Sequence, residues 1–157
     1  MPRFEEKIIS PDKITNFIFE RPLVFTNGCF DILHRGHVTY LSEAKAKGKY
    51  LIVALNTDES VKRLGKQGNR PINCLDDRMA IIASLMDVDY VTFFDEDTPL
   101  ELINKIKPNI LVKGGDWELK KIVGYQEVIG NNGVVYSIPF IYHTSTTKVI
   151  NKICYEQ

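Results

Sequence analysis

The sequence predicts an α/β fold: a Rossmann-like sheet of five parallel strands with helices on both of its faces. Short runs rich in β-branched and aromatic residues alternate with longer amphipathic runs, which is typical of a parallel sheet with helical crossovers. Each short run is almost continuously apolar, as expected for strands that are covered on both faces. The length of 157 residues suits one domain of ordinary size.

The predicted strands lie at residues 23–26, 50–55, 90–94, 110–112 and 134–138. Helices are predicted at residues 38–46, 76–86 and 99–106, and a last helix begins at Ser145 or Thr146 and turns Val149, Ile150 and Ile153 inward. Thr98 and Glu101 have the spacing of a capping box at the start of the third helix. The longest apolar run is far too short to cross a bilayer, so we expect no membrane partner.

Two parts of the chain are expected from this pattern. Residues 1–20 are predicted to form a helical extension, and residues 21–157 form the main domain. The long loop that holds Gly65, Gly68 and Pro71 is expected to have a function, since loops of that length in a small α/β domain are seldom accidental.

The charge and cysteine content narrow the function classes. Twenty Lys and Arg residues balance twenty Asp and Glu residues, so nothing in the overall charge favours binding to nucleic acid or to an anionic membrane. The N-terminus lacks the apolar stretch of a signal peptide, which predicts a cytoplasmic location. Cys29, Cys74 and Cys154 are widely spaced and are expected to be free thiols.

The segment after the first strand has the features of a phosphate site. Ligands of open α/β sheets bind beyond the carboxyl ends of the strands. There Gly28 allows close approach of the backbone, and His34 and His37 flank the start of a helix, where N–H groups lack partners. Both imidazoles lie on one helix face, so both can donate to the same phosphate group.

The same residues allow three other interpretations. The histidines could simply cap the helix. Asp31, His34 and His37 repeat at intervals of three and could bind a metal, but a fourth ligand is lacking nearby, so no protein-held metal is predicted. Cys29 with a histidine could act as a nucleophile, but no third residue is evident to orient the pair.

Polar groups also follow the other strands. They are Asn56 and Asp58, then Lys66 and Arg70 with their basic neighbours; Lys113, Gly114 and Asp116; and the hydroxyls of Ser145, Thr146 and Thr147. Each group alone can be a solvated loop, a plain turn or a helix cap. A second helix N-terminus at the same rim, however, would surround one polyphosphate with two positive dipole ends. The chain has neither a GxxxxGK[ST] loop nor a GxGxxG fingerprint, which disfavours P-loop hydrolysis and dinucleotide redox chemistry.

Residues 26–37, which contain an HxGH element, resemble the nucleotidyltransferase superfamily that includes cytidylyltransferases and class I aminoacyl-tRNA synthetases. Residues 145–147 are similar to its second signature, the Ser/Thr-rich start of the last helix. Within that superfamily, residues 54–64, 70–71, 75–80 and 112–116 together resemble the D-glycero-β-D-manno-heptose 1-phosphate adenylyltransferases. This branch also occurs as one half of a bifunctional heptose kinase/adenylyltransferase.

The resemblance implies that residues 21–157 are a nucleotidyltransferase domain. It would transfer AMP from ATP to the sugar 1-phosphate and give ADP-heptose and pyrophosphate for lipopolysaccharide core biosynthesis. Mg²⁺ would be held mainly by the ATP phosphates, and the protein would be a homodimer. The implied catalytic residues are His34, His37 and Lys66; those for nucleotide and phosphate are Thr26, Asn27, Gly28, Cys29, Phe30, Gly36, Asn56, Asp58, Phe140, Tyr142, Ser145, Thr146 and Thr147; those for the sugar phosphate are Asp31, Arg78, Lys113, Gly114 and Asp116.

Two features depart from the pattern of the relatives. Ile150 stands where many members have a basic residue, so Lys148, Lys152 or another group is expected to complete the phosphate site there. His143 and Thr144 replace an expected Gly-Cys pair. The alternatives are another small-phosphate nucleotidyltransferase, with CDP-glycerol-like or FAD-like products, and a non-catalytic nucleotide sensor.

Overall fold

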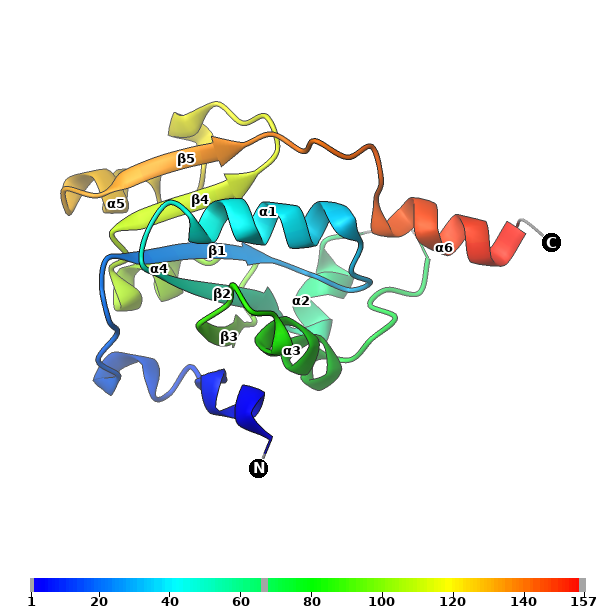
Figure 1. The fold of residues 1–157 in the computed structure, drawn as a ribbon, viewed down its shortest axis with the longest axis horizontal. Helices are drawn as coiled ribbons and strands as arrows, with labels where there is room; N and C mark the ends of the chain where they lie inside the picture. Colours follow the sequence, from blue (N-terminus) through cyan, green and yellow to red (C-terminus); the bar gives the residue numbers. More distant parts are fainter. Residues whose placement is uncertain (1, 66–67, 156–157) are drawn as a thin grey trace.

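The computed structural model describes residues 2–65 and 68–155 and contains the predicted sheet (Figure 1). All five strands are parallel, in the order β3-β2-β1-β4-β5. Their bounds are Leu23–Gly28 for β1, Tyr50–Asn56 for β2, Tyr90–Phe94 for β3, Ile110–Gly114 for β4 and Val134–Ile138 for β5. The predicted fold class is confirmed.

Helices cover both faces of the sheet. They are α1 (Arg35–Lys45), α2 (Asp58–Arg63), α3 (Leu75–Ser84), α4 (Leu100–Ile106), α5 (Tyr125–Gly130) and α6 (Thr146–Tyr155), with 3-10 turns η1 (Arg3–Lys7), η2 (Ile14–Asn16) and η3 (Leu119–Lys121). Figure 1 shows α1 and α3 in front of the sheet and α4 and α5 behind it. The sequence did not predict α2 and α5, because helices of 6 residues are too short to show a periodic pattern.

The apolar core has two layers, one on each side of the sheet. Alternate residues of a strand point to opposite faces. In β1, Leu23 and Phe25 therefore pack in the layer that contains α4 and α5, whereas Val24 packs in the layer that contains α1 and α3. The sheet is thus covered on both faces, as its continuous apolar runs indicate.

The N-terminal segment packs against the sheet. Ile9, Ile14 and Phe19 are buried in the same layer as α4. The amide of Ile9 donates to the carbonyl of Val91 at 2.8 Å, so the segment pairs with the edge of β3. It thereby covers backbone groups that an edge strand would otherwise expose.

Helix α6 lies beyond the sheet, at the end to which the arrowheads of β1 and β5 point (Figure 1). Its predicted inward stripe is not buried: Val149 and Ile150 are half-buried, and Ile153 is 67% exposed. The reason is its position, because a helix that leaves the edge of the sheet has no sheet face to pack on. At the start of the helix, Thr146 Oγ1 donates to the Ile32 carbonyl at 2.9 Å.

Candidate active site

A cavity of about 550 Å³ opens where β1 and β4 end. The strand order reverses between these two neighbours, and ligands of open α/β sheets bind at such a point. The cavity is lined by Asn27, Gly28, Cys29, Phe30, Asp31, His34, Gly36, His37, Tyr40, Arg70, Lys113, Gly114, Phe140, Tyr142, Thr144, Ser145, Thr146 and Thr147. The residues after β1 and the start of α6, far apart in sequence, therefore share one cavity, as predicted.

Two histidines form the wall at the start of α1. His34 is the N-cap, and its Nδ1 accepts a hydrogen bond from the amide of Gly36 at 3.1 Å. The amide of His34 in turn donates to Nδ1 of His37 at 3.3 Å. Because each Nδ1 is an acceptor, the neutral rings carry their proton on Nε2, which is then a donor. Burial lowers the pKa of His34 below its ordinary value and so favours this neutral form.

The capping interpretation and the phosphate interpretation of the histidines are therefore compatible. Nδ1 of each ring stabilises the turn, and Nε2 is on the opposite side of the ring. The early cap also explains why α1 begins at Arg35 rather than at the predicted residue 38.

The opposite wall contains the start of α6. Ser145 Oγ accepts a hydrogen bond from the amide of Lys148 at 3.2 Å, which is an ordinary cap. The Nζ of Lys148 donates to the His143 carbonyl at 2.8 Å and does not line the cavity, and neither does Lys152. The basic charge expected from these two lysines is thus absent from the cavity wall.

Asp31 and Arg70 form a buried ion pair in the wall. Arg70 Nε donates to Asp31 Oδ2 at 2.5 Å, and the two side chains are 5% and 0% exposed. The same carboxylate accepts from the amides of Ile72 and Asn73 at 2.9 Å. Burial alone would raise the pKa of Asp31, but these amides and the guanidinium outweigh it, so the pKa lies below the ordinary value.

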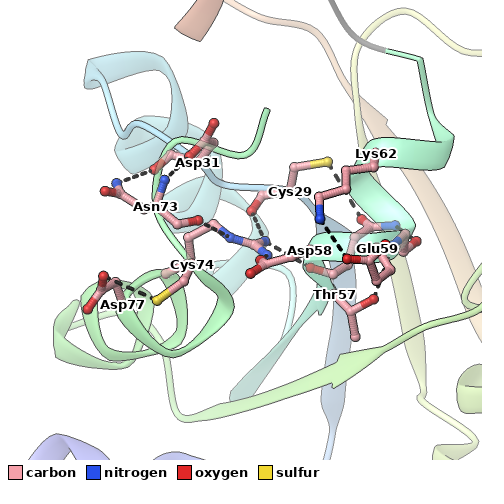
Figure 2. A network of polar contacts seen from close by, with 12 residues as sticks. Cys29, Asp31, Thr57, Asp58, Glu59, Lys62, Asn73, Cys74 and Asp77 are labelled. Carbon is pink, nitrogen blue, oxygen red and sulfur yellow. Dashed lines mark hydrogen bonds and ion pairs between the residues drawn. The ribbon is translucent and has the colours of Figure 1, made fainter. Parts of the chain in front are cut away.

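Arg78, which was predicted to bind the sugar phosphate, lies behind the cavity wall. Its side chain is fully buried, and its NH1 donates to the carbonyls of Cys29 and Asn56 at 2.8 and 2.9 Å. Nε donates to the Asn73 carbonyl at 3.1 Å, and NH2 pairs with Asp58 at 2.6 Å. Figure 2 shows this network, with Asp31 and Asn73 on one side and Cys29 and Asp58 on the other. The guanidinium joins segments of the protein and does not line the cavity, and its predicted contact with the sugar phosphate stays a prediction.

Other predicted site residues also lie outside the wall. The hydroxyl of Thr26 is buried against that of Tyr40 at 2.5 Å, and Asn56 Nδ2 donates to Ser60 at 3.0 Å. The carboxylate of Asp58 forms an ion pair with Arg78. Asp116 lies in the turn after β4 and does not line the cavity. Lys66 falls outside the described residues.

Three cavity residues were missing from the predicted set: Arg70, Tyr40 and Thr144. The sequence indicates Arg70 only as part of a basic loop. The length of that loop is the one feature of the sequence that points to a functional role for it. Tyr40 lies inside α1, where an aromatic residue resembles any core position. Thr144 directly precedes the predicted hydroxyls of residues 145–147.

An aromatic surface completes the cavity. The ring of Phe140 is 56% exposed and lies so close to Gly114 that a Cβ there would be 2.8 Å from Phe140 Cζ. Trp117 Nε1 donates to the Gly114 carbonyl at 2.9 Å and holds the turn in place. The guanidinium of Arg35 lies 4.3 Å from the centre of the Tyr142 ring. Exposed aromatic faces of this kind suit a planar base.

Within residues 2–65 and 68–155, no three His, Cys, Asp or Glu side chains are grouped so that they could hold a metal ion. None of the helices in this part of the chain is long and apolar enough to span a membrane.

Comparisons with known proteins agree with this architecture. The family model described as cytidylyltransferase-like matches residues 25–152. The chain is 50% identical over 155 residues to a D-beta-D-heptose 1-phosphate adenylyltransferase from Bordetella bronchiseptica, with 96% of each chain covered. It is 52% identical over 151 residues to the Bifunctional protein HldE of Haemophilus ducreyi, where the match covers 93% of this chain but only 32% of that protein.

Solved structures show the same fold. A lipopolysaccharide core biosynthesis protein from Thermoplasma volcanium matches with a TM-score of 0.63 and 28% identity, over 78% of this chain and 98% of its own. Pantothenate synthetase from Thermus thermophilus matches with a TM-score of 0.65 over 91% of this chain and 67% of its own, and at 14% identity it shows the fold alone. The chain is thus a nucleotidyltransferase that belongs to the cytidylyltransferase-like family.

Proposed function

We propose that this chain transfers AMP from ATP to D-glycero-β-D-manno-heptose 1-phosphate, giving ADP-heptose and pyrophosphate. The observation that carries the proposal is the single cavity shared by the two imidazoles after β1 and the start of α6. The Bordetella relative, similar over nearly its whole length, supports the choice of nucleotide and sugar.

The reaction needs alignment and charge neutralisation more than proton transfer. An oxygen of the sugar phosphate forms a bond to the α-phosphorus of ATP, and the bond from that phosphorus to the bridging oxygen of pyrophosphate breaks. The attacking oxygen is already an anion at neutral pH, so no general base is required. The protein's task is to place donors where negative charge grows.

The chain supplies such donors from two sides. Nε2 of His34 and of His37 would donate to the phosphates while the rings are neutral. Ser145, Thr146 and Thr147 would bind the β- and γ-phosphates at the start of α6. The exposed ring of Phe140 and the ring of Tyr142 would contact the base. The role of Lys66 in closing the loop stays a prediction.

The donor set also fits Mg²⁺ held through substrate oxygens. Asp31 is the one carboxylate among the described residues that line the cavity, and its oxygens already accept from Arg70, Ile72 and Asn73. Mg²⁺ commonly relies on substrate phosphates and water, and it would help neutralise their charge. The homodimer and the cytoplasmic location belong to the same proposal.

The test is a substrate panel. ATP, CTP, GTP and UTP are each combined with the heptose 1-phosphate, glycerol 3-phosphate and flavin mononucleotide in the presence of Mg²⁺, and pyrophosphate release is measured. Release with ATP and the heptose phosphate supports the proposal. Release only with another pair would assign a different nucleotidyltransferase activity, and ATP binding without release from any pair would indicate a sensor.

A further inference from the structure

Arg70 is a cation buried in the wall of the cavity, and the reaction scheme above gives it no role. Its side chain is 5% exposed and lines the cavity on the side of the loop that precedes α3. Burying a permanent charge is unfavourable unless it is paired, and an ion pair buried for stability alone seldom gains over apolar packing. A buried pair at the wall of a substrate cavity is therefore a candidate for function.

The ion pair uses only part of the Arg70 guanidinium. A guanidinium has five N–H donors, and Asp31 takes the one on Nε. No other described side chain or carbonyl accepts from its two terminal nitrogens. Among residues 2–65 and 68–155, Thr92 Oγ1 is the one side-chain nitrogen or oxygen that is fully buried and has no hydrogen-bond partner. The terminal nitrogens of Arg70 are therefore not fully buried. Since Arg70 lines the cavity, we infer that its terminal nitrogens are accessible from there.

The surrounding contacts fix this guanidinium in place. The carboxylate of Asp31 is held by the amides of Ile72 and Asn73, and Asn73 Nδ2 donates back to the Asp31 carbonyl at 2.9 Å. The Asn73 carbonyl is in turn bound by the buried Arg78. A fork of N–H groups that is oriented before the ligand arrives loses little entropy on binding.

We propose that Arg70 binds phosphate oxygens of a substrate through its terminal nitrogens, and that Asp31 is the positioning residue that orients it. The planar fork matches a phosphate group with two parallel hydrogen bonds. This inference rests on the proposed function, which brings two sources of phosphate into the cavity: the ATP chain and the sugar 1-phosphate. Arg70 would supply the contact whether the phosphate belongs to ATP or to the sugar 1-phosphate.

The experiment compares Arg70→Gln, Arg70→Lys and Asp31→Asn with a matched control, Arg63→Gln. Arg63 is an ion-paired arginine near the same loop, but it faces Asp97 at the surface and does not line the cavity. KM and kcat are measured separately for ATP and for the sugar phosphate. Calorimetric titration with ATP alone and with inorganic phosphate alone follows binding without turnover.

Arg70→Gln is expected to raise the KM or the dissociation constant for one phosphate source by about tenfold or more, since it removes charged hydrogen bonds. A change confined to ATP assigns the contact to the nucleotide, and a change confined to the sugar phosphate assigns it to the acceptor. Arg70→Lys should recover only part of the loss. Asp31→Asn should raise the same constant, and adding it to Arg70→Gln should have little further effect.

Constants that stay within twofold of the wild type in Arg70→Gln would overturn the proposal. Loss of the cooperative thermal transition in both Arg70 variants would assign the residue to the fold and overturn it as well. A wild type that binds ATP or phosphate but releases no pyrophosphate with the heptose phosphate would refute the proposed function, whereas the titrations would still decide on Arg70.

Discussion

The rings of His34 and His37 lie 3.9 Å apart, centre to centre, and the backbone of the same turn donates to the Nδ1 of each. The protein thereby selects the tautomer that presents Nε2–H. A neutral pair can lie this close without the repulsion that two imidazolium ions would suffer. The backbone hydrogen bonds to Nδ1 therefore explain both why the two rings can lie so close and why Nε2 is the donor.

Substituting His34 separates its two roles. His34→Asn keeps a good N-cap, whereas His34→Ala loses it at about 1 kcal/mol of stability. Both remove the Nε2 donor, so we expect both to reduce kcat by about a hundredfold to a thousandfold. Denaturation curves measure the first effect and pyrophosphate release the second. Near-normal turnover of His34→Asn would mean that the residue is only a cap.

The pH dependence follows from the lowered pKa of His34. The folded state disfavours the imidazolium, so the unfolded state binds more protons once the pH falls below the ordinary value of 6.5. The stability from this group is fully present above pH 6.5 and is lost as the pH falls through the folded pKa. We expect an NMR titration of the His34 ring to have its midpoint below 6.5, and a midpoint above that value would contradict the burial argument.

Arg78 is expected to matter for stability more than any surface arginine. Arg78→Met removes its hydrogen bonds to the buried carbonyls of Cys29 and Asn56 and to the partly buried carbonyl of Asn73, and it leaves Asp58 without this partner. Because the Asp58 side chain is 34% exposed, the larger cost comes from the carbonyls left without a donor, at about 1–3 kcal/mol for each one that is buried. Urea denaturation measures it, with Arg63→Met as the control because Arg63 is exposed and its loss should change little. An unchanged midpoint for Arg78→Met would show that the network adds nothing.

Gly114 is predicted to set the position of Phe140. A Cβ at residue 114 would lie 2.8 Å from Phe140 Cζ and 3.1 Å from Tyr40 Cε2, so Gly114→Ala must push the exposed Phe140 ring away. We expect the KM for ATP to rise and stability to fall by about 1–3 kcal/mol. Gly130→Ala is the matched control, because no atom lies within 4 Å of its Cβ position. Equal KM values for both variants would remove Phe140 from the nucleotide site.

The sequence predicted the sheet well because each strand is covered on both faces and so carries an unbroken apolar signal. It predicted the shared cavity because the carboxyl ends of parallel strands meet at one edge of the sheet, where the segments that follow β1 and β5 both begin. The burial of α6 was mispredicted, since an apolar stripe does not say whether a sheet face is available to receive it.

The charged site residues were harder to place than the strands. Arg70 and Arg78 are both arginines near the same loop, but one lines the cavity and the other lies behind it. The difference depends on which carbonyls and carboxylates reach each guanidinium, and these come from segments distant in sequence. Asp31 lines the cavity, but its carboxylate faces a loop that periodicity does not describe, and its contact with the sugar phosphate stays a prediction.

The pairing of Ile9 with Val91 also sets an order for assembly during synthesis. Residues 8–20 leave the ribosome before any strand of the sheet, yet Ile9, Ile14 and Phe19 pack in a core layer that includes residues of α4, which is made much later. Contacts between residues so far apart in sequence slow folding, because the chain loses the entropy of closing the loop before the contact stabilises it. The nascent chain must therefore keep Ile9, Ile14 and Phe19 from misassociating until its second half has been translated.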